Sequence, residues 1–291
     1  MAHSSPILLL GSTGMLGRAF VSLLRDQNAT ILTPGRDAID LADPSSVGKF
    51  IGAVSSPPRL VINCAAWTDV DGAEANEASA TRVNAQAVGE LARVAADWRA
   101  LFVTFGTDYV FAGNALVPYR VDESRAPLNA YGRSKAKGEE ALEALARERA
   151  EARWLHIRTS WLYAPWGKNF VRTMSGLLRS KPAISVVNDQ RGRPTSAEQL
   201  ASATLALVDQ GATGHWHATD GGECTWFEFA REIGRLTNAA GVVNPCGSEQ
   251  FPRPAKRPAY SVLDIARTER AIGAMTTWQE SLAKVVSCIE P

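Results

Sequence analysis

ILLLGSTGMLG, residues 7–17, joins an apolar run to a loop that contains three glycines. The apolar run predicts a short buried strand, and residues 18–24 have the apolar spacing of a helix. Glycines let the backbone turn tightly and approach a pyrophosphate, while free amides at a helix start face the anion. Strand, loop and helix in this order predict a dinucleotide cradle at Gly11, Gly14 and Gly17. The G-x-x-G-x-x-G spacing departs from the usual G-x-G-x-x-G fingerprint, and a plain loop is the alternative.

Strand and helix patterns alternate through the first half of the chain. Strands are expected at 29–33, 60–63, 101–105 and 154–158, and helices from Pro44, over 83–98 and from Tyr131 onward. Asp43 is expected to cap the helix that Pro44 begins. This alternation predicts an α/β fold with a doubly wound, Rossmann-like parallel sheet.

The pattern changes after Tyr163 to loops interrupted by Pro and Gly. A short strand is expected at 184–187, and helices near 197–208, 226–236 and 278–286. This half is too irregular to form a second dinucleotide fold. We therefore expect a dinucleotide-binding domain at 1–164 and a smaller, irregular substrate region at 165–291.

The composition is that of an ordinary globular protein. The chain has 291 residues, of which 45% are hydrophobic and 21% charged, and its net charge is +1. Such a charge creates no strong field toward nucleic acid or an anionic membrane, so we expect a small-molecule partner.

The four cysteines are scattered, without the close pairs of zinc sites or redox dithiols. With no signal peptide and no apolar run near the ~20 residues of a membrane span, the expected location is the cytoplasm.

An arginine follows the second expected strand, where dinucleotide folds distinguish their cofactors. An acidic residue near this point bonds the ribose 2′-hydroxyl of NADH, whereas an arginine accommodates the 2′-phosphate of NADPH. Arg36 therefore favours NADPH, although Asp37 and Asp40 keep NADH possible. An exposed turn arginine without such a role is the alternative.

Tyr131 and Lys135 stand one turn apart on the same face of an expected helix. The phenol of a free tyrosine has a pKa of about 10. A fixed cation nearby lowers this pKa. Tyr131 could then give a proton to a carbonyl oxygen as a hydride reaches the carbon. Thr107, at the end of the strand that begins at residue 101, would supply a second donor. A helix start with a solvated lysine is the alternative, because Tyr-x-x-x-Lys is common by chance.

Other polar and aromatic residues have two interpretations each. Trp161 is either a wall of the substrate site or part of the core. Asp189 and Gln190 either hold a nucleotide or order a loop, and Arg257 either meets a diphosphate or is a surface charge. His215 and His217 alternate as on one face of a strand, but no further ligand is evident, so no metal site is expected.

Several motifs in register resemble the dTDP-4-dehydrorhamnose reductase family of the extended short-chain dehydrogenase/reductase superfamily. Beside the glycine loop they are NCAAWT at 63–68, TDYVF at 107–111, PLNAYG at 127–132, RTSW at 158–161, NDQRGRPT at 188–195 and RPAYS at 257–261. The resemblance spans nearly the whole chain. It implies that a hydride from NADPH or NADH reduces the C4 ketone of dTDP-4-dehydro-L-rhamnose to give dTDP-L-rhamnose.

The resemblance also implies roles for individual residues. The family's catalytic Thr, Tyr and Lys match Thr107, Tyr131 and Lys135. Its cofactor contacts match Gly14, Met15, Leu16, Asp40, Leu41, Ala65, Ala66 and Trp67, together with Tyr131 and Lys135. Its substrate contacts match Thr107, Asp108 and Trp161.

Two positions depart from the family pattern. Gly106 stands where relatives often carry serine. Some members dimerise through carboxylates that share Mg²⁺; Glu198 could match one of them, but Ala19 falls where another is expected. We therefore expect no bound metal, and either a monomer or a homodimer.

Two other function classes remain open. The regulatory subunit of methionine adenosyltransferase is similar to this family, so a regulatory binding protein is one alternative. A reductase or epimerase of another nucleotide sugar is the other.

Overall fold

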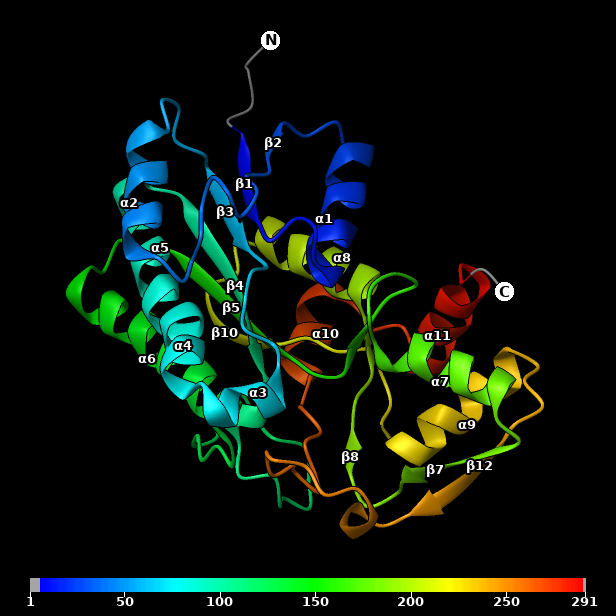
Figure 1. Cartoon of the computed structure of the whole chain (residues 1–291). Helices are drawn as coiled ribbons and strands as arrows, with labels where there is room; N and C mark the ends of the chain where they lie inside the picture. Colours follow the sequence, from blue (N-terminus) through cyan, green and yellow to red (C-terminus); the bar gives the residue numbers. More distant parts are fainter. Residues whose placement is uncertain (1–5, 290–291) are drawn as a thin grey trace.

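A parallel sheet of six strands forms the centre of the computed structural model, which describes residues 6–289 (Figure 1). The strand order is β10-β5-β4-β3-β1-β2, and each neighbouring pair is parallel. The strands are β1 Ile7–Leu10, β2 Ile31–Leu32, β3 Leu60–Asn63, β4 Leu101–Thr107, β5 Trp154–Thr159 and β10 Gly214–His217. The predicted fold class is confirmed.

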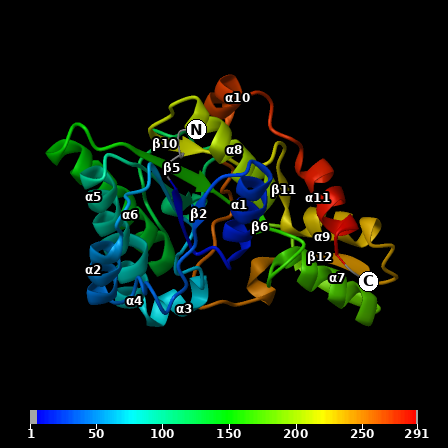
Figure 2. The same ribbon diagram turned by 90° about the horizontal axis from the view of Figure 1, so that it is seen from above.

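Helices cover both faces of the sheet (Figure 2). Leu8 and Leu10 of β1 pack toward one layer, and Ile7 and Leu9 toward the other, because successive side chains of a strand alternate between faces. The first layer contains α2 Pro44–Ala53, α5 Ala87–Asp97 and α6 Ala130–Glu148, and the second contains α1 Met15–Asp26 and α8 Ala197–Asp209. Burial on both faces explains why these strands are continuous apolar runs.

Short helices lead into the first layer. They are α3 Val70–Ala75, α4 Glu77–Thr81 and a π-helical turn Arg82–Gln86 that continues into α5. The predicted cap of α2 is confirmed, since the Asp43 side chain accepts from the backbone nitrogen of Ser45 at 2.8 Å. α6 begins beside Tyr131 because the side chain of Asn129 accepts from the amide of Gly132 at 2.8 Å.

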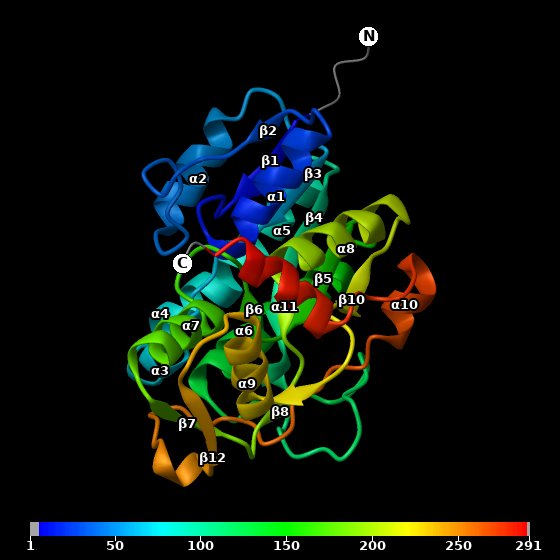
Figure 3. The same cartoon turned by 90° about the vertical axis from the view of Figure 1, so that its right-hand side faces the viewer.

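The remaining elements form a smaller body beside the carboxyl ends of the strands (Figure 3). Its hydrophobic core surrounds Phe229. It contains β6 Leu162–Tyr163, α7 Phe170–Ser180, β7 Ala183–Val187, β8 Arg191–Gly192, β9 Thr195–Ser196, β11 Cys224–Thr225, α9 Trp226–Leu236, β12 Val242–Cys246 and α11 Trp278–Ser287. β7 and β12 pair in parallel, and β8 pairs with β11.

The division expected at residue 164 stays a prediction. Three elements that follow this point pack with the central sheet: α8 lies against α1, β10 extends the sheet beyond β5, and α10 Ala266–Ile272 packs against the same core through Ala271 and Ile272. The chain therefore returns to the first region before it completes the second. Over residues 6–289, no helix combines the length and apolar character needed to cross a bilayer.

Candidate active site

The loop between β1 and α1 lies against the end of β3. Gly11 has a φ of +71°, and a Cβ there would lie 2.7 Å from the backbone nitrogen of Ala65. A Cβ at Gly17 would overlap the carbonyl oxygen of Gly11. Both positions need glycine because the helix and the neighbouring strand approach the same turn of backbone. At Gly14, α1 has no side-chain cap and no acidic residue in its first turn, so its first amides are open to an anion.

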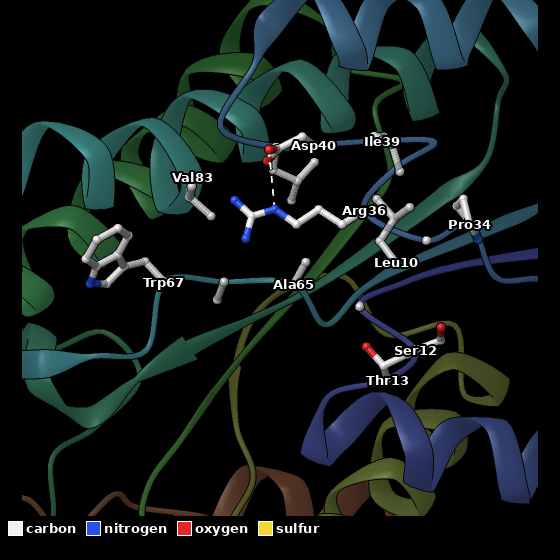
Figure 4. Close-up of a pocket in the computed structure, with 14 residues that line it drawn as sticks. Leu10, Ser12, Thr13, Pro34, Arg36, Ile39, Asp40, Ala65, Trp67 and Val83 are labelled. Atoms are coloured by element: carbon white, nitrogen blue, oxygen red, sulfur yellow. Dashed lines mark hydrogen bonds and ion pairs between the residues drawn. The ribbon is translucent and has the colours of Figure 1, made fainter. Parts of the chain in front are cut away.

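A cavity of about 330 Å³ lies over this loop (Figure 4). The predicted cofactor residues that line it are Gly11, Arg36, Asp40, Leu41, Ala65, Ala66 and Trp67. Of the others, Gly14, Met15, Leu16 and Gly17 form the loop and the first turn of α1, and Tyr131 and Lys135 lie on α6. The side chain of Leu16 packs into the core, so this residue offers the cavity only its backbone. Glycine loop, open amides and strand ends together fit the pyrophosphate of a dinucleotide.

Arg36 extends across the cavity in Figure 4 and contacts Asp40. Its Nε lies 3.3 Å from Asp40 Oδ2, and 81% of its side chain is exposed. This single contact uses only part of the guanidinium, which has five N–H donors. The remaining donors are free to bind an anion at the mouth of the cavity.

Asn84, in the π-helical turn, holds one wall of the cavity in place. Its side chain accepts from the amide of Trp67 at 2.9 Å and donates to the carbonyl oxygen of Trp67 at 3.0 Å. It also donates to the hydroxyl of Ser134 on α6 at 2.9 Å. This buried amide ties the cofactor wall to the helix that carries Tyr131. The sequence placed Asn84 near a helix start but gave no sign of this role.

Thr107, Tyr131 and Lys135 converge where β4 ends and α6 begins. The hydroxyl of Thr107 donates to Asp108 Oδ1 at 3.0 Å and accepts from the amide of Tyr109 at 3.2 Å. Lys135 Nζ donates to the carbonyl oxygen of Phe105 at 2.9 Å, two residues before Thr107. The helix period thus places the phenol and the ammonium on the side of α6 that faces the strand end.

The protonation of Tyr131 differs from the expectation. Burial raises its pKa to about 12, and a hydrogen bond with Thr107 opposes the rise in part. Burial also lowers the pKa of Lys135 to about 8. The Lys135 ammonium is directed to the backbone carbonyl of Phe105. The predicted lowering of the phenol pKa by Lys135 is therefore wrong for this structure. A neutral phenol is nevertheless the form that can donate a proton.

Asp108 lies next to this group and is 3% exposed. Burial raises its pKa to about 7, although hydrogen bonds with Ser261 and Thr107 lower it in part. Its Oδ2 is buried without a hydrogen-bond partner. Because the ionised carboxylate accepts the proton of Thr107, the protonation of Asp108 decides whether that hydroxyl can donate elsewhere.

A second cavity, of about 460 Å³, begins beside the same group. Tyr109, one of its lining residues, packs edge to face on Tyr131 with ring centroids 6.0 Å apart. Its other walls are largely apolar and include Phe170, Met174, Leu177, Val186, Trp226 and Phe251, with Gln190, Arg253 and Arg257 among them. Asp71 pairs with Arg257 at 3.0 Å and with Arg253 at 3.6 Å. Sequence reasoning missed the apolar walls and Arg253, because no motif marks them.

The structure shows the contacts of several residues for which the sequence left two interpretations. Trp161 has a φ of +46°, and its ring stacks on Trp226 with centroids 3.5 Å apart. Trp226 lines the second cavity, so Trp161 supports that wall from behind. Asp189 accepts from the amide and hydroxyl of Ser248 at 2.8 and 2.6 Å, which orders a loop. Gln190 also donates to this hydroxyl, at 2.8 Å, and lines the cavity.

No cluster of three or more His, Cys, Asp or Glu side chains that could hold a metal occurs within residues 6–289. Ala19 is buried where α1 meets α8, whereas Glu198 at the start of α8 is exposed. Instead, His215 contacts Glu143 on α6, and His217 contacts Arg158 on β5.

Comparison with known proteins gave one consistent result. A family model described as the RmlD substrate binding domain matches residues 5–290. A dTDP-4-keto-6-deoxy-D-glucose reductase from Streptomyces niveus is 40% identical over 279 residues, covering 95% of each chain. A dTDP-4-dehydrorhamnose reductase from Streptomyces griseus is 36% identical over 284 residues, covering 95% of this chain and 91% of the relative. The solved dTDP-4-dehydrorhamnose reductase from Bacillus anthracis str. Ames in complex with NADP matches with a TM-score of 0.90 and 32% identity, covering 97% of this chain and 98% of that one.

Proposed function

Because this chain belongs to the dTDP-4-dehydrorhamnose reductase family, we propose that it reduces the C4 ketone of dTDP-4-dehydro-L-rhamnose to dTDP-L-rhamnose, with NADPH or NADH as hydride donor. The observation that carries the proposal is the convergence of Thr107, Tyr131 and Lys135 beside Tyr109, which lines the second cavity. The first cavity suits the dinucleotide, and the second suits the nucleotide sugar.

Each of the three residues has a separate task in this reaction. When bound, the nicotinamide supplies the hydride. Tyr131 gives its proton to the carbonyl oxygen, and the hydroxyl of Thr107 stabilises the charge that develops there. Lys135 would hold the cofactor beside the phenol. Tyr131 and Lys135 therefore serve both the cofactor and the chemistry.

The two regions of the chain divide the binding. Residues 1–164 provide the glycine loop, Arg36 and the wall at Trp67, which would hold the cofactor. Residues 165–291 provide most of the second cavity, where Arg253 and Arg257 would meet the diphosphate of the sugar nucleotide. Asp108 and Trp161 would act on the substrate through Thr107 and Trp226 respectively.

A second candidate substrate is dTDP-4-keto-6-deoxy-D-glucose. The relative from Streptomyces niveus that is 40% identical is named as its reductase. The two sugars place a C4 ketone on the same kind of nucleotide carrier, so the same three residues would serve either one. The shape of the second cavity around the sugar ring decides between them.

Substrate assays test the proposal. Purified protein should consume NADPH, followed by its absorbance, when dTDP-4-dehydro-L-rhamnose is added, and should form dTDP-L-rhamnose. The same assay with dTDP-4-keto-6-deoxy-D-glucose gives the kcat/KM of the second candidate substrate, which is compared with that of the first. Absence of NADPH consumption with both sugars would contradict the proposal. Copurification with a synthetase would then favour a regulatory binding protein. NAD that stays tightly bound through purification would favour an epimerase.

Arg36 should set the preference for NADPH. In Arg36→Ala, we expect the KM for NADPH to rise about tenfold, because the exposed guanidinium no longer binds the 2′-phosphate. The KM for NADH should change little, since NADH lacks that group. Steady-state kinetics with both cofactors measures this. Arg179→Ala, at an exposed position on α7, is the control and should alter neither constant. An equal rise for both cofactors would show that Arg36 does not read the phosphate.

A further inference from the structure

Asp71, on α3, contacts a segment that lies far from it in the sequence. Its Oδ2 lies 3.0 Å from Arg257 Nη2 and 3.6 Å from Arg253 Nη1. Its Oδ1 accepts from the amide of Ala255 at 3.2 Å. We call residues 253–257 the arginine segment. One carboxylate thus contacts both arginines of this segment and the backbone between them.

The start of α6 also holds the arginine segment. The side chain of Asn129 donates to the carbonyl oxygen of Lys256 at 2.9 Å, and its oxygen accepts from the amide of Gly132 at 2.8 Å. Ala255 is 1% exposed, so the middle of the segment is packed against the protein. The backbone of the arginine segment is therefore anchored at the start of the helix that carries Tyr131.

Arg257 lies next to an aromatic residue that contacts the catalytic group. Its guanidinium carbon is 6.0 Å from the centroid of the Tyr109 ring, and Tyr109 packs edge to face on Tyr131. Arg253, Arg257 and Tyr109 all line the second cavity. An anion bound by the two arginines would therefore occupy the cavity that begins beside the proton donor.

The two arginines are held to different degrees. Arg257 also donates from Nη1 to the carbonyl oxygen of Ala255 at 3.2 Å, and 19% of its side chain is exposed. Within residues 6–289, the one ion pair of Arg253 is its 3.6 Å contact with Asp71, and 62% of its side chain is exposed. These contacts use only part of the five N–H donors of each guanidinium. The remaining donors can bind phosphate oxygens while Asp71 stays in place.

The carboxylate belongs to the same run of chain as the wall of the first cavity. Trp67, which lines that cavity, donates from Nε1 to the carbonyl oxygen of Asp69 at 2.9 Å. Asp69 caps α3 by accepting from the amide of Gly72 at 2.9 Å, and Asp71 follows in the first turn. The contacts of Asp71 therefore join the chain beside the first cavity to the arginines of the second.

We propose that Asp71 is a positioning residue, whose carboxylate holds Arg253 and Arg257 in place for the diphosphate of the sugar nucleotide. The inference rests on the proposed function, because that function supplies the diphosphate. An arginine side chain loses much rotamer freedom when it is fixed against a ligand. Because Asp71 orients both guanidiniums beforehand, less of this freedom remains to be lost on binding.

The charge of Asp71 acts in the opposite direction, because a carboxylate repels a phosphate. The Asp71 side chain is 25% exposed, so solvent and salt screen this repulsion. Two arginines and one aspartate also leave the group with a net positive charge. We therefore expect the orientation of the arginines to have the larger effect on affinity.

Calorimetry with dTDP tests this role without any turnover. In Asp71→Ala, we expect the dissociation constant for dTDP to rise about tenfold, because both guanidiniums lose the group that orients them. Asp71→Asn keeps an oxygen that can accept from Ala255 and Arg257, so its affinity should lie between those of the wild type and Asp71→Ala. Asp122→Ala, which removes the partner of Arg120 outside the second cavity, is the control and should bind dTDP as the wild type does.

Thymidine, which has no phosphate, separates the positioning role from a general change in the cavity. Its binding, followed in ligand-observed nuclear magnetic resonance spectra, should be the same in the wild type and in Asp71→Ala. Equal losses of affinity for thymidine and dTDP would overturn the proposal. Wild-type affinity for dTDP in Asp71→Ala, or tighter binding of dTDP by Asp71→Asn than by the wild type, would also overturn it.

Steady-state kinetics gives a second measurement. In Asp71→Ala, the KM for the sugar nucleotide should rise about tenfold, whereas kcat and the KM for NADPH should stay within about threefold, because Thr107, Tyr131 and the first cavity are unchanged. A fall in kcat without a rise in this KM would contradict a positioning role.

The two proposals fail in different ways. If the wild type binds dTDP but reduces neither keto sugar, the proposed reaction is wrong and the role of Asp71 is still tested by calorimetry. If the wild type reduces a keto sugar and Asp71→Ala binds dTDP equally well, only the role of Asp71 is wrong. Absence of dTDP binding by the wild type would overturn both.

Discussion

Tyr131→Phe is expected to reduce turnover by about 10²- to 10⁴-fold, the range that a general acid contributes. The variant loses only the hydroxyl that protonates the substrate oxygen. Its ring keeps the edge-to-face contact with Tyr109, so the fold and the second cavity should be retained. Turnover is measured from NADPH absorbance, and NADPH affinity from its fluorescence on binding. We expect the affinity to remain within about threefold of the wild type, because most cofactor contacts lie elsewhere.

Tyr119→Phe is the matched control for this change. Its hydroxyl accepts from the backbone nitrogens of Asn114 and Ala115, outside the site. Loss of that hydroxyl should leave turnover close to wild type. If Tyr131→Phe retained full turnover, Tyr131 would not be the proton donor. If both variants lost turnover equally, the effect would be structural.

Glu139→Gln is expected to lower the free energy of unfolding by about 3–5 kcal/mol, the usual effect of breaking a buried ion pair. Glu139 is fully buried and accepts from Arg158 Nε at 2.8 Å and Nη2 at 2.7 Å. The variant leaves Arg158, a residue that is 2% exposed, without its charged partner. Urea denaturation measures the difference. Glu148→Gln, which breaks the exposed pair with Arg93, should change stability by less than about 1 kcal/mol.

The same carboxylate should make stability depend on pH. Burial raises the pKa of Glu139, but hydrogen bonds from Arg158 and nearby charges outweigh it and lower the pKa to about 2. A depressed pKa adds stability above the unfolded value of 4.5, and this contribution disappears as the pH falls from 4.5 toward 2. Denaturation between pH 6 and 3 should therefore show a steeper loss in the wild type than in Glu139→Gln. Equal slopes would mean that Glu139 is not preferentially ionised in the folded state.

Local features of the fold followed directly from the sequence. The strand at Leu60–Asn63, the helix at Trp226–Leu236 and the cap at Asp43 have the predicted bounds or contacts. Each depends on side-chain periodicity or on hydrogen bonds between near neighbours. The family and the cofactor class also followed, because several motifs occur in register.

Contacts between distant segments were not predictable in this way. A strand was expected at His215–His217, but the sequence did not show that this strand, β10, pairs with β5 at the edge of the sheet. The apolar walls of the second cavity come from α7, β7 and α9, and none of these segments has a distinctive motif. Their meeting depends on how the whole chain packs.

The sequence by itself determined the order of the elements, the family, and the one-turn spacing of Tyr131 and Lys135, since these depend on residue type and spacing along the chain. Only the tertiary structure decided the protonation of the site. Burial raised the pKa of Tyr131 where a neighbouring cation was expected to lower it. It also brought His156 and His215 within 3.0 Å across the sheet. Solvation and distance between remote segments are properties of the packed chain, so a linear pattern does not contain them.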